Sequence, residues 1–196
     1  MRKLHIISTI CFILLIISNC KAQKLSNLDS LSGFDKFKFG VKATKYPDLK
    51  KSEHQIAPRH IMYEDTRNKN YKIEGINFRL GQIFSSLNTK LIRFVLWSNY
   101  DSFVSMDNDF QKVQHHFEKL YGKEFKTEKY FNNIAGDSLY SYTSTWEWKT
   151  KEVEITEIYN ISLGGKVTRN GDLFVGFYDN KFDKKRRKKI TEREEY

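Results

Sequence analysis

The clearest pattern in the chain is a stripe of apolar residues at helical spacing between positions 106 and 121. Its members recur at steps of three and four residues: Phe110, Val113, Phe117, Leu120 and Tyr121. Asp107 or Asn108 supplies an N-cap, and Gly122 supplies a left-handed stop. The spacing therefore predicts one principal helix whose apolar stripe lies on a sheet.

Apolar and aromatic runs predict strands before this helix. The runs 71–78, 80–85 and 90–98 are rich in β-branched and aromatic residues, and Gly75 and Gly81 separate them. They indicate an antiparallel meander. The third run has apolar side chains on both faces, which favours a central strand: Ile92, Phe94 and Leu96 share one face, and Leu91, Val95 and Trp97 share the other.

Further strands are predicted after the helix, at 139–148, 152–159 and 173–178. The dipeptide Asn170-Gly171, between two apolar segments, predicts a tight type I′ turn. The fold class expected is α+β, a mostly antiparallel sheet with one principal helix (about 106–121) packed on it. This order of elements is similar to that of small exported lipoproteins in which a helix packs on a sheet, a resemblance of architecture that implies no residue role.

The predicted single domain covers residues 33–180. It begins with aromatic residues at strand spacing in 34–39, and the segment 41–60, interrupted by two prolines, predicts only a short helix or turn. A polar tether is expected at 23–32, and a basic flexible tail at 181–196.

The first 22 residues are typical of a secretory signal peptide. Arg2 and Lys3 precede an apolar run at 6–18, and that run is shorter than the roughly 20 residues that a transmembrane helix needs. Residues 17–20 resemble a lipobox, which predicts a lipidated Cys20 at the mature N-terminus. A small-x-small site before Gln23 instead predicts cleavage after Ala22 and a periplasmic or secreted protein; both alternatives predict export.

Cysteine and charge narrow the function classes. Cys11 and Cys20 both fall within the signal region, so the mature domain is expected to contain no disulfide, thiolate metal site or cysteine nucleophile. The chain carries a formal net charge of +10. Export makes nucleic acid an unsuitable partner for the basic tail, which is either a solvated extension or a contact for anionic lipid or an acidic partner. Its cationic run is Lys184, Lys185, Arg186, Arg187, Lys188 and Lys189.

No motif predicts a catalytic set, a metal or a cofactor. His115 and His116 are adjacent, so on a helix they point in different directions, and the metalloprotease spacing is absent. Glu152 and Glu154 share one strand face and offer a carboxylate pair, although alternating acids on a solvated strand face are the simpler interpretation.

Aromatic residues of the 139–148 run are the candidate binding residues: Tyr140, Tyr142, Trp146 and Trp148. Such a ladder either packs under the helix as core or presents flat rings to a sugar or a partner protein. The leading hypothesis is a non-enzymatic envelope protein, lipid-anchored through Cys20, that binds another envelope protein or a polysaccharide. The alternative is a periplasmic hydrolase or carbohydrate-processing enzyme that uses carboxylates near the aromatic hairpin.

Overall fold

The computed structural model describes residues 27–53, 60–86, 89–123, 126–134, 137–148, 151–162, 170–179 and 181. The predicted signal, the lipidation site Cys20 and the cationic run 184–189 lie outside these residues. No helix in the described ranges is long and apolar enough to cross a membrane.

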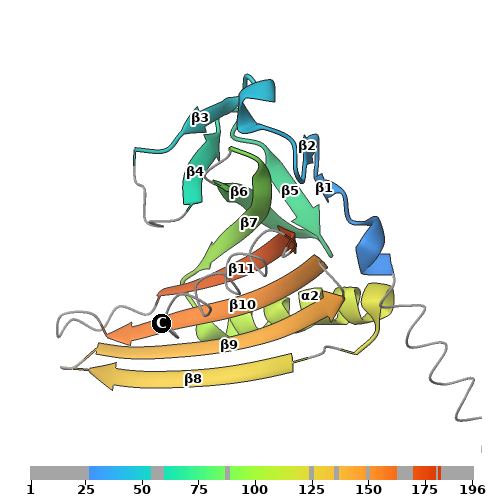
Figure 1. Cartoon of the computed structure of the whole chain (residues 1–196). Coiled ribbons are helices and arrows are strands. Elements are labelled where there is room, and N and C mark those ends of the chain that lie inside the picture. The colour runs from blue at the N-terminus through green and yellow to red at the C-terminus, as the bar shows by residue number, and fades with distance from the viewer. Residues whose placement is uncertain are drawn as a thin grey trace, which may run out of the picture.

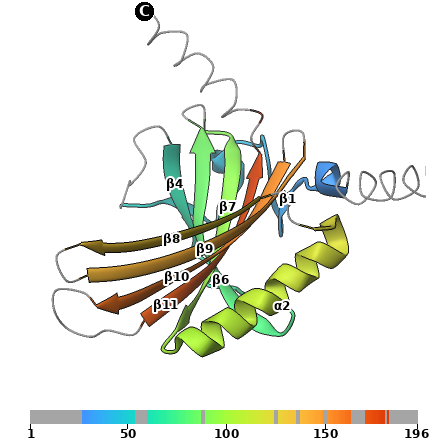
Figure 2. The same cartoon turned by 90° about the horizontal axis from the view of Figure 1, so that it is seen from below.

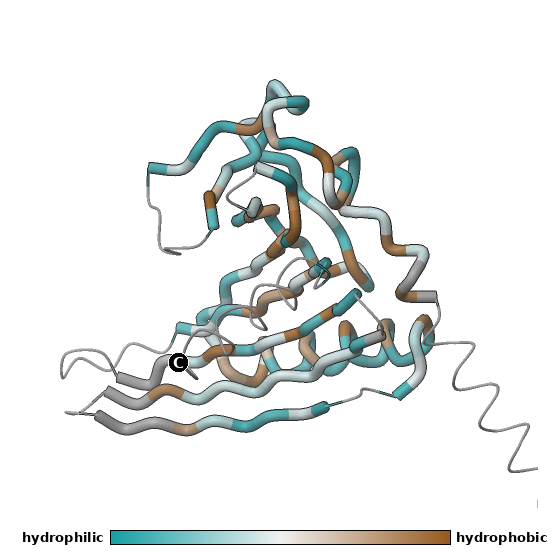
Figure 3. Tube along the Cα trace, in the orientation of Figure 1, coloured by the Kyte–Doolittle hydropathy of each residue, from teal (hydrophilic) through white to brown (hydrophobic). Residues whose placement is uncertain are grey.

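One curved antiparallel sheet dominates the described residues, and its strands follow the order β3-β4-β6-β7-β11-β10-β9-β8, with β5 paired to one end of β6 (Figure 1). The strands are β3 (Leu49–Lys51), β4 (His60–Asp65), β5 (Asn70–Ile73), β6 (Ile76–Ser86), β7 (Leu91–Tyr100), β8 (Lys126–Ile134), β9 (Asp137–Trp148), β10 (Lys151–Ser162) and β11 (Asn170–Asp179). The edge strand β8 is mostly hydrophilic (Figure 3), as suits a sheet edge that faces water.

The helix α2 (Phe103–Tyr121) packs on one face of this sheet, against β7, β10 and β11 (Figure 2). Its buried side chains are Met106, Phe110, Val113 and Phe117. A mostly antiparallel sheet with one principal helix on it is the α+β fold that the sequence predicted. Leu120, placed in the apolar stripe, is 42% exposed, whereas Tyr121 beside it packs against the core.

The helix begins earlier than the sequence indicated. Ser102 occupies the N-cap, so Asp107 and Asn108 lie within the helix. The added turn is held by tertiary packing, because the ring of Phe103 lies 5.4 Å from that of Tyr140. Its C-terminal end agrees with the prediction: Gly122 has a φ of 88° and donates its N–H to the carbonyl of Glu118.

Of the two glycines expected to separate strands, Gly75 does so and Gly81 does not. Gly81, expected to end a strand, lies in a bulge within a continuous β6, where the pairing to β7 shifts between Leu80 and Gln82. The chain instead turns at Glu74 and Gly75, whose φ values are 49° and 81°. A bulge accommodates one additional residue without ending a strand.

The predicted turn at Asn170-Gly171 is wrong. Both residues belong to β11, where Asn170 pairs with Asn160 and Gly171 pairs with Tyr159. A Cβ at Gly171 would lie 2.6 Å from Sδ of Met106, so this glycine is needed for the close approach of the helix rather than for a turn.

The N-terminal segment is more ordered than the expected tether. The 3-10 helix η1 (Asn27–Ser30) brings Leu28 into the core with no exposed surface, and Leu31 also packs there. Residues 34–39 form a small hairpin of β1 (Gly33–Phe34) and β2 (Phe37–Lys38) rather than one strand, followed by η2 (Ala43–Lys45). Burial of Leu28 and Leu31 explains why the fold begins before residue 33.

The central position of β7 was predicted correctly, since it lies between β6 and β11 and contributes to two apolar clusters. The larger cluster fills the space between sheet and helix. On the opposite face a small cluster contains Met62, Phe84, Ile92 and Val95. Ile92 lies on that face, and not with Phe94 as predicted, because the pairing of β6 with β7 shifts between Phe84 and Ser85.

Candidate functional site

The sheet has two unequal faces, named here the covered face, on which α2 packs, and the open face opposite. Residues of the open face come from alternate positions of each strand. Trp97 of β7 is paired with Phe174 of β11, which is paired with Thr156 of β10, so these three side chains form one row across the open face.

Three hollows on the open face join into one groove. Their volumes are about 540, 350 and 210 Å³. The first and second share Gly81 and Trp97 in their linings, and the second and third share Gln82, Val95 and Phe174. The open-face groove therefore runs from the β4–β6 region, past Trp97 and Phe174, to β10.

Aromatic rings at the groove lie on glycines. A Cβ at Gly81 would come within 2.6 Å of Nε1 of Trp97, and one at Gly176 within 2.6 Å of the Tyr178 hydroxyl. The missing side chains let each ring lie against the backbone. Burial raises the pKa of Tyr178 well above its usual range, so its hydroxyl remains protonated and able to donate a hydrogen bond.

Arg93 is held at the third hollow by two rings. Its guanidinium carbon lies 5.0 Å from the ring centre of Phe84 and 4.5 Å from that of Tyr178. The Nε atom is buried and has no hydrogen-bond partner within the described ranges. The two rings fix the plane of the guanidinium at the end of the groove, and only its terminal nitrogens can donate to a ligand there.

Carboxylates and amides complete the lining. Asn99 donates to the carboxylate of Asp172, whose pKa is raised by burial. The hydroxyl of Thr156 donates to Glu154 at 3.0 Å. Together with Gln82, these groups surround the two rings with planar donors and acceptors.

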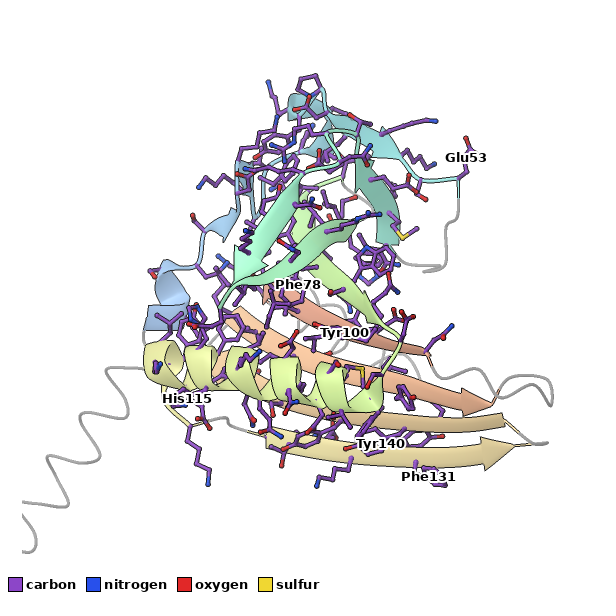
Figure 4. The ribbon with its side chains drawn as sticks, turned by 180° about the vertical axis from the view of Figure 1, so that it is seen from behind. Glu53, Phe78, Tyr100, His115, Phe131 and Tyr140 are labelled. Atoms are coloured by element: carbon purple, nitrogen blue, oxygen red, sulfur yellow. The ribbon has the colours of Figure 1, made fainter. Side chains whose placement is uncertain are left out.

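The predicted aromatic ladder lies on the other face. Trp146 is fully buried under α2 and donates its indole N–H to the carbonyl of Gly122 at 2.8 Å. The ring of Tyr142 lies 5.0 Å from that of Phe110, and Tyr140 lies between β9 and the start of the helix (Figure 4). Of the two interpretations, this geometry is that of core packing; the side chain of Trp148 lies outside the described part.

The carboxylate pair and the ladder do not meet. Glu152 and Glu154 alternate with Val153 on β10 and therefore lie on the open face, whereas Tyr140 and Tyr142 lie on the covered face. Only Glu154 of the pair lines the open-face groove.

Glu157 is a buried acid that the sequence pattern did not single out. It shares the covered face with Val153 and Ile155, and its exposed fraction is 0%. Neither carboxylate oxygen has a hydrogen-bond partner in the described part of the chain. Burial raises its pKa to about 7, and the charge of Asp107 adds to the shift, while Tyr140 and Lys129 partly oppose it. The sequence did contain a sign of this burial, because Glu157 follows Val153 and Ile155 at steps of two residues and so lies on the same face of the strand.

The histidines of α2 make surface contacts. His116 Nδ1 lies 2.7 Å from Glu74, which connects the helix to the β5–β6 turn, and His115 Nδ1 lies 3.6 Å from Glu118. His115 is on the outer side of the helix (Figure 4). Among the described side chains, no three His, Cys, Asp or Glu residues are grouped to hold a metal ion.

No protein family model, curated protein or solved structure matches this chain. The functional argument therefore depends on the chemistry of the open-face groove.

Proposed function

We propose that this chain is an exported, non-enzymatic envelope protein that binds a polysaccharide along the open-face groove. The observation that carries the proposal is the continuity of the three hollows past the paired rings of Trp97 and Phe174. Export is supported by the signal-like segment at residues 1–22, and attachment to a membrane by the lipobox that ends at Cys20.

The groove chemistry favours sugar. A sugar ring has an apolar C–H face and a rim of hydroxyls, so it requires flat aromatic surface beside planar donors and acceptors. The flat aromatic surface comes from Trp97 and Phe174. The planar donors and acceptors come from Gln82, Asn99 and Asp172. A purely apolar ligand would cover these polar groups without forming hydrogen bonds to them.

The shape of the groove favours an extended ligand. The two larger hollows fall in the size range of ordinary ligand sites, yet they are joined side by side rather than enclosed. A polymer that lies along them contacts each hollow in turn, and many weak contacts can add up to useful affinity.

The test is binding of the full mature chain to polysaccharides extracted from envelopes, measured by affinity electrophoresis and calorimetry. Trp97→Ala is expected to weaken binding at least tenfold, about 1.4 kcal/mol, because it removes the central ring. Phe131→Ala is the matched control, since Phe131 is 63% exposed on β8 and does not line any of the three hollows. Equal affinity of Trp97→Ala and wild type would refute the proposal.

Membrane attachment has its own test. Intact-mass analysis of protein from native membranes is expected to give an acylated N-terminal Cys20. An unmodified N-terminal Gln23 would show a free exported protein, without affecting the groove.

Contact of the cationic run 184–189 with anionic lipid is expected to weaken steeply as salt rises.

A hydrolase is the second candidate, and one observation favours it. Asp172, whose pKa is raised by burial, and Glu154 line neighbouring hollows of the groove, so two carboxyl groups face the same ligand path. Chain shortening that Asp172→Asn or Glu154→Gln abolishes, with binding retained, would establish it. Activity that survives both Asp172→Asn and Glu154→Gln would remove it.

A further inference from the structure

We infer that the open-face groove selects an acidic polysaccharide, with Arg93 binding the carboxylate of one sugar residue. This inference rests on the proposed function and adds the class of sugar. It is carried by the surroundings of Arg93, by a comparison with Arg67, and by the positions of the acidic residues nearby.

Arg93 is already held in a binding geometry. Phe84 on β6 and Tyr178 on β11 stack on its guanidinium from the two strands that flank β7. Stacking of this kind restricts the side chain before any ligand arrives, so little conformational entropy is lost on binding. The planar fork of donors matches the two oxygens of a carboxylate.

Arg67 shows how an arginine with an internal role is satisfied in this fold. It too stacks on a ring, that of Phe37 at 4.9 Å, but it also contacts Asp65 at 2.6 Å and Asp35 at 2.9 Å. Arg93 takes part in none of the ion pairs of the described residues, and its buried Nε has no acceptor there. Because no ion pair uses the guanidinium, its terminal nitrogens are left to bind an acceptor that a ligand supplies.

The acids near the third hollow form no ion pair with Arg93 among the described residues. Glu154 accepts its hydrogen bond from Thr156, which lies two residues along β10 in the direction away from the row of Arg93. Glu152 is paired with Tyr178, the neighbour of Arg93, so its backbone lies two strand spacings from that of Arg93, about 10 Å. Glu154 lines the same hollow as the guanidinium, and the charges of Glu152 and Glu154 both raise the pKa of Tyr178. Arg93 nevertheless forms no ion pair with either acid among the described residues, so its charge is left for a ligand.

The groove spans more than one sugar residue. Trp97 and Arg93 are four residues apart on β7, which corresponds to about 13 Å along an extended strand. One ligand can thus stack on Trp97 and Phe174 while a carboxylate farther along the polymer reaches Arg93. The whole chain carries a net charge of +10, and the mature chain stays positive after loss of Arg2 and Lys3, which attracts a polyanion to the protein as a whole.

The experiment compares matched pairs of polymers: several polyuronates, each beside its own carboxyl-reduced form. Calorimetry with the full mature chain is expected to show that the acidic member of a pair binds at least tenfold more tightly than the reduced member. Arg93→Met keeps the aliphatic stem between the rings and removes the donors, so it is expected to abolish this preference and leave affinity for the reduced polymer unchanged. Lys119→Met, an equal loss of charge on the exposed side of α2, is expected to retain the preference.

The outcomes separate this inference from the proposed function. If wild type binds both members of each pair equally, the acidic preference is wrong and polysaccharide binding stands. If Arg93→Met weakens both members alike at an unchanged melting temperature, Arg93 has no role specific to the carboxylate. If no polymer of either kind binds, the proposed function fails and the inference fails with it.

Discussion

The covered and open faces of the sheet are built from the same strands and differ in what the fold demands of them. On β11, Leu173 and Val175 are fully buried under the helix, while Asp172 and Phe174, each one residue away, line the groove. Core positions and groove positions thus alternate at a period of two residues, and under the proposed function stability and ligand binding depend on alternate residues. Substitutions at neighbouring positions should therefore change different quantities: at one position the free energy of unfolding, and at the next the affinity for the ligand.

A second difference between the faces is how their rings are supported. Rings of the covered face pack on other side chains, as Trp146 does on Phe117 at 5.7 Å. Rings of the open face lie on glycine backbone, as Trp97 does at Gly81. The first arrangement fills space, and the second leaves hollows that a ligand can occupy.

The largest expected effect is on the covered face. Trp146→Ala should lower the free energy of unfolding by about 3–5 kcal/mol, because it empties a fully buried site and removes a hydrogen bond. Trp97→Ala should cost about 1 kcal/mol. Urea unfolding of both variants measures the difference, and equal losses would show that the two faces are not distinct.

Glu157→Gln should stabilise the protein in a pH-dependent manner. The unfolded chain loses this proton near the ordinary pKa of 4.5, but the fold keeps it until about 7, so the free energy of unfolding of the wild type falls as pH rises between these values. Above that window the penalty is constant. The variant should therefore be more stable by up to about 3 kcal/mol at pH 8 and nearly equal at pH 4.

Thermal unfolding at the two pH values checks this prediction. Glu154→Gln is the matched control, since Glu154 lies on the open face of the same strand. A stabilisation by Glu157→Gln that is the same at both pH values would mean that the buried carboxyl does not change its ionisation on folding.

Gly176→Ala should weaken polysaccharide binding about tenfold, or about 1.4 kcal/mol, because the added Cβ displaces the ring of Tyr178 and with it Arg93. Gly171→Ala on the same strand should lower stability instead, since its Cβ meets Met106 under the helix. Calorimetry measures the binding of both variants and urea unfolding measures their stability, so each substitution should change one of the two quantities more than the other. Unchanged binding by Gly176→Ala would place the ligand elsewhere.

The smallest expected effect is at the end of the helix. Gly122→Ala should cost about 1 kcal/mol, because a φ of 88° is unfavourable for any residue with a Cβ. Its polysaccharide affinity should match that of wild type. A change in affinity would mean that the helix communicates with the open face.

How much the sequence could predict depends on whether the signal was local. The stripe of α2 and the two apolar faces of β7 were evident, because each element repeats its burial pattern over many residues. The pair Asn170-Gly171 led to a wrong prediction of a turn, because contact of β11 with Met106 outweighed the local turn preference. For the aromatic ladder, alternation gave the correct face, but not whether the helix covered it.

The groove could not be predicted from sequence. Its lining comes from positions between Glu64 and Tyr178, and these residues meet only when the sheet order places β11 between β7 and β10. The glycines that create the hollows resemble strand breaks in the sequence. Only the three-dimensional pairing shows that Gly81 and Gly176 each lie under an aromatic ring.

The most direct measurement of the central claim is a two-dimensional NMR titration of the mature protein with the polysaccharide, following the indole N–H signals of Trp97 and Trp146. The account predicts that the signal of Trp97 shifts progressively with ligand, while that of Trp146, hydrogen-bonded under the helix, stays in place. A saturating titration that moves Trp146 and leaves Trp97 unchanged would contradict it.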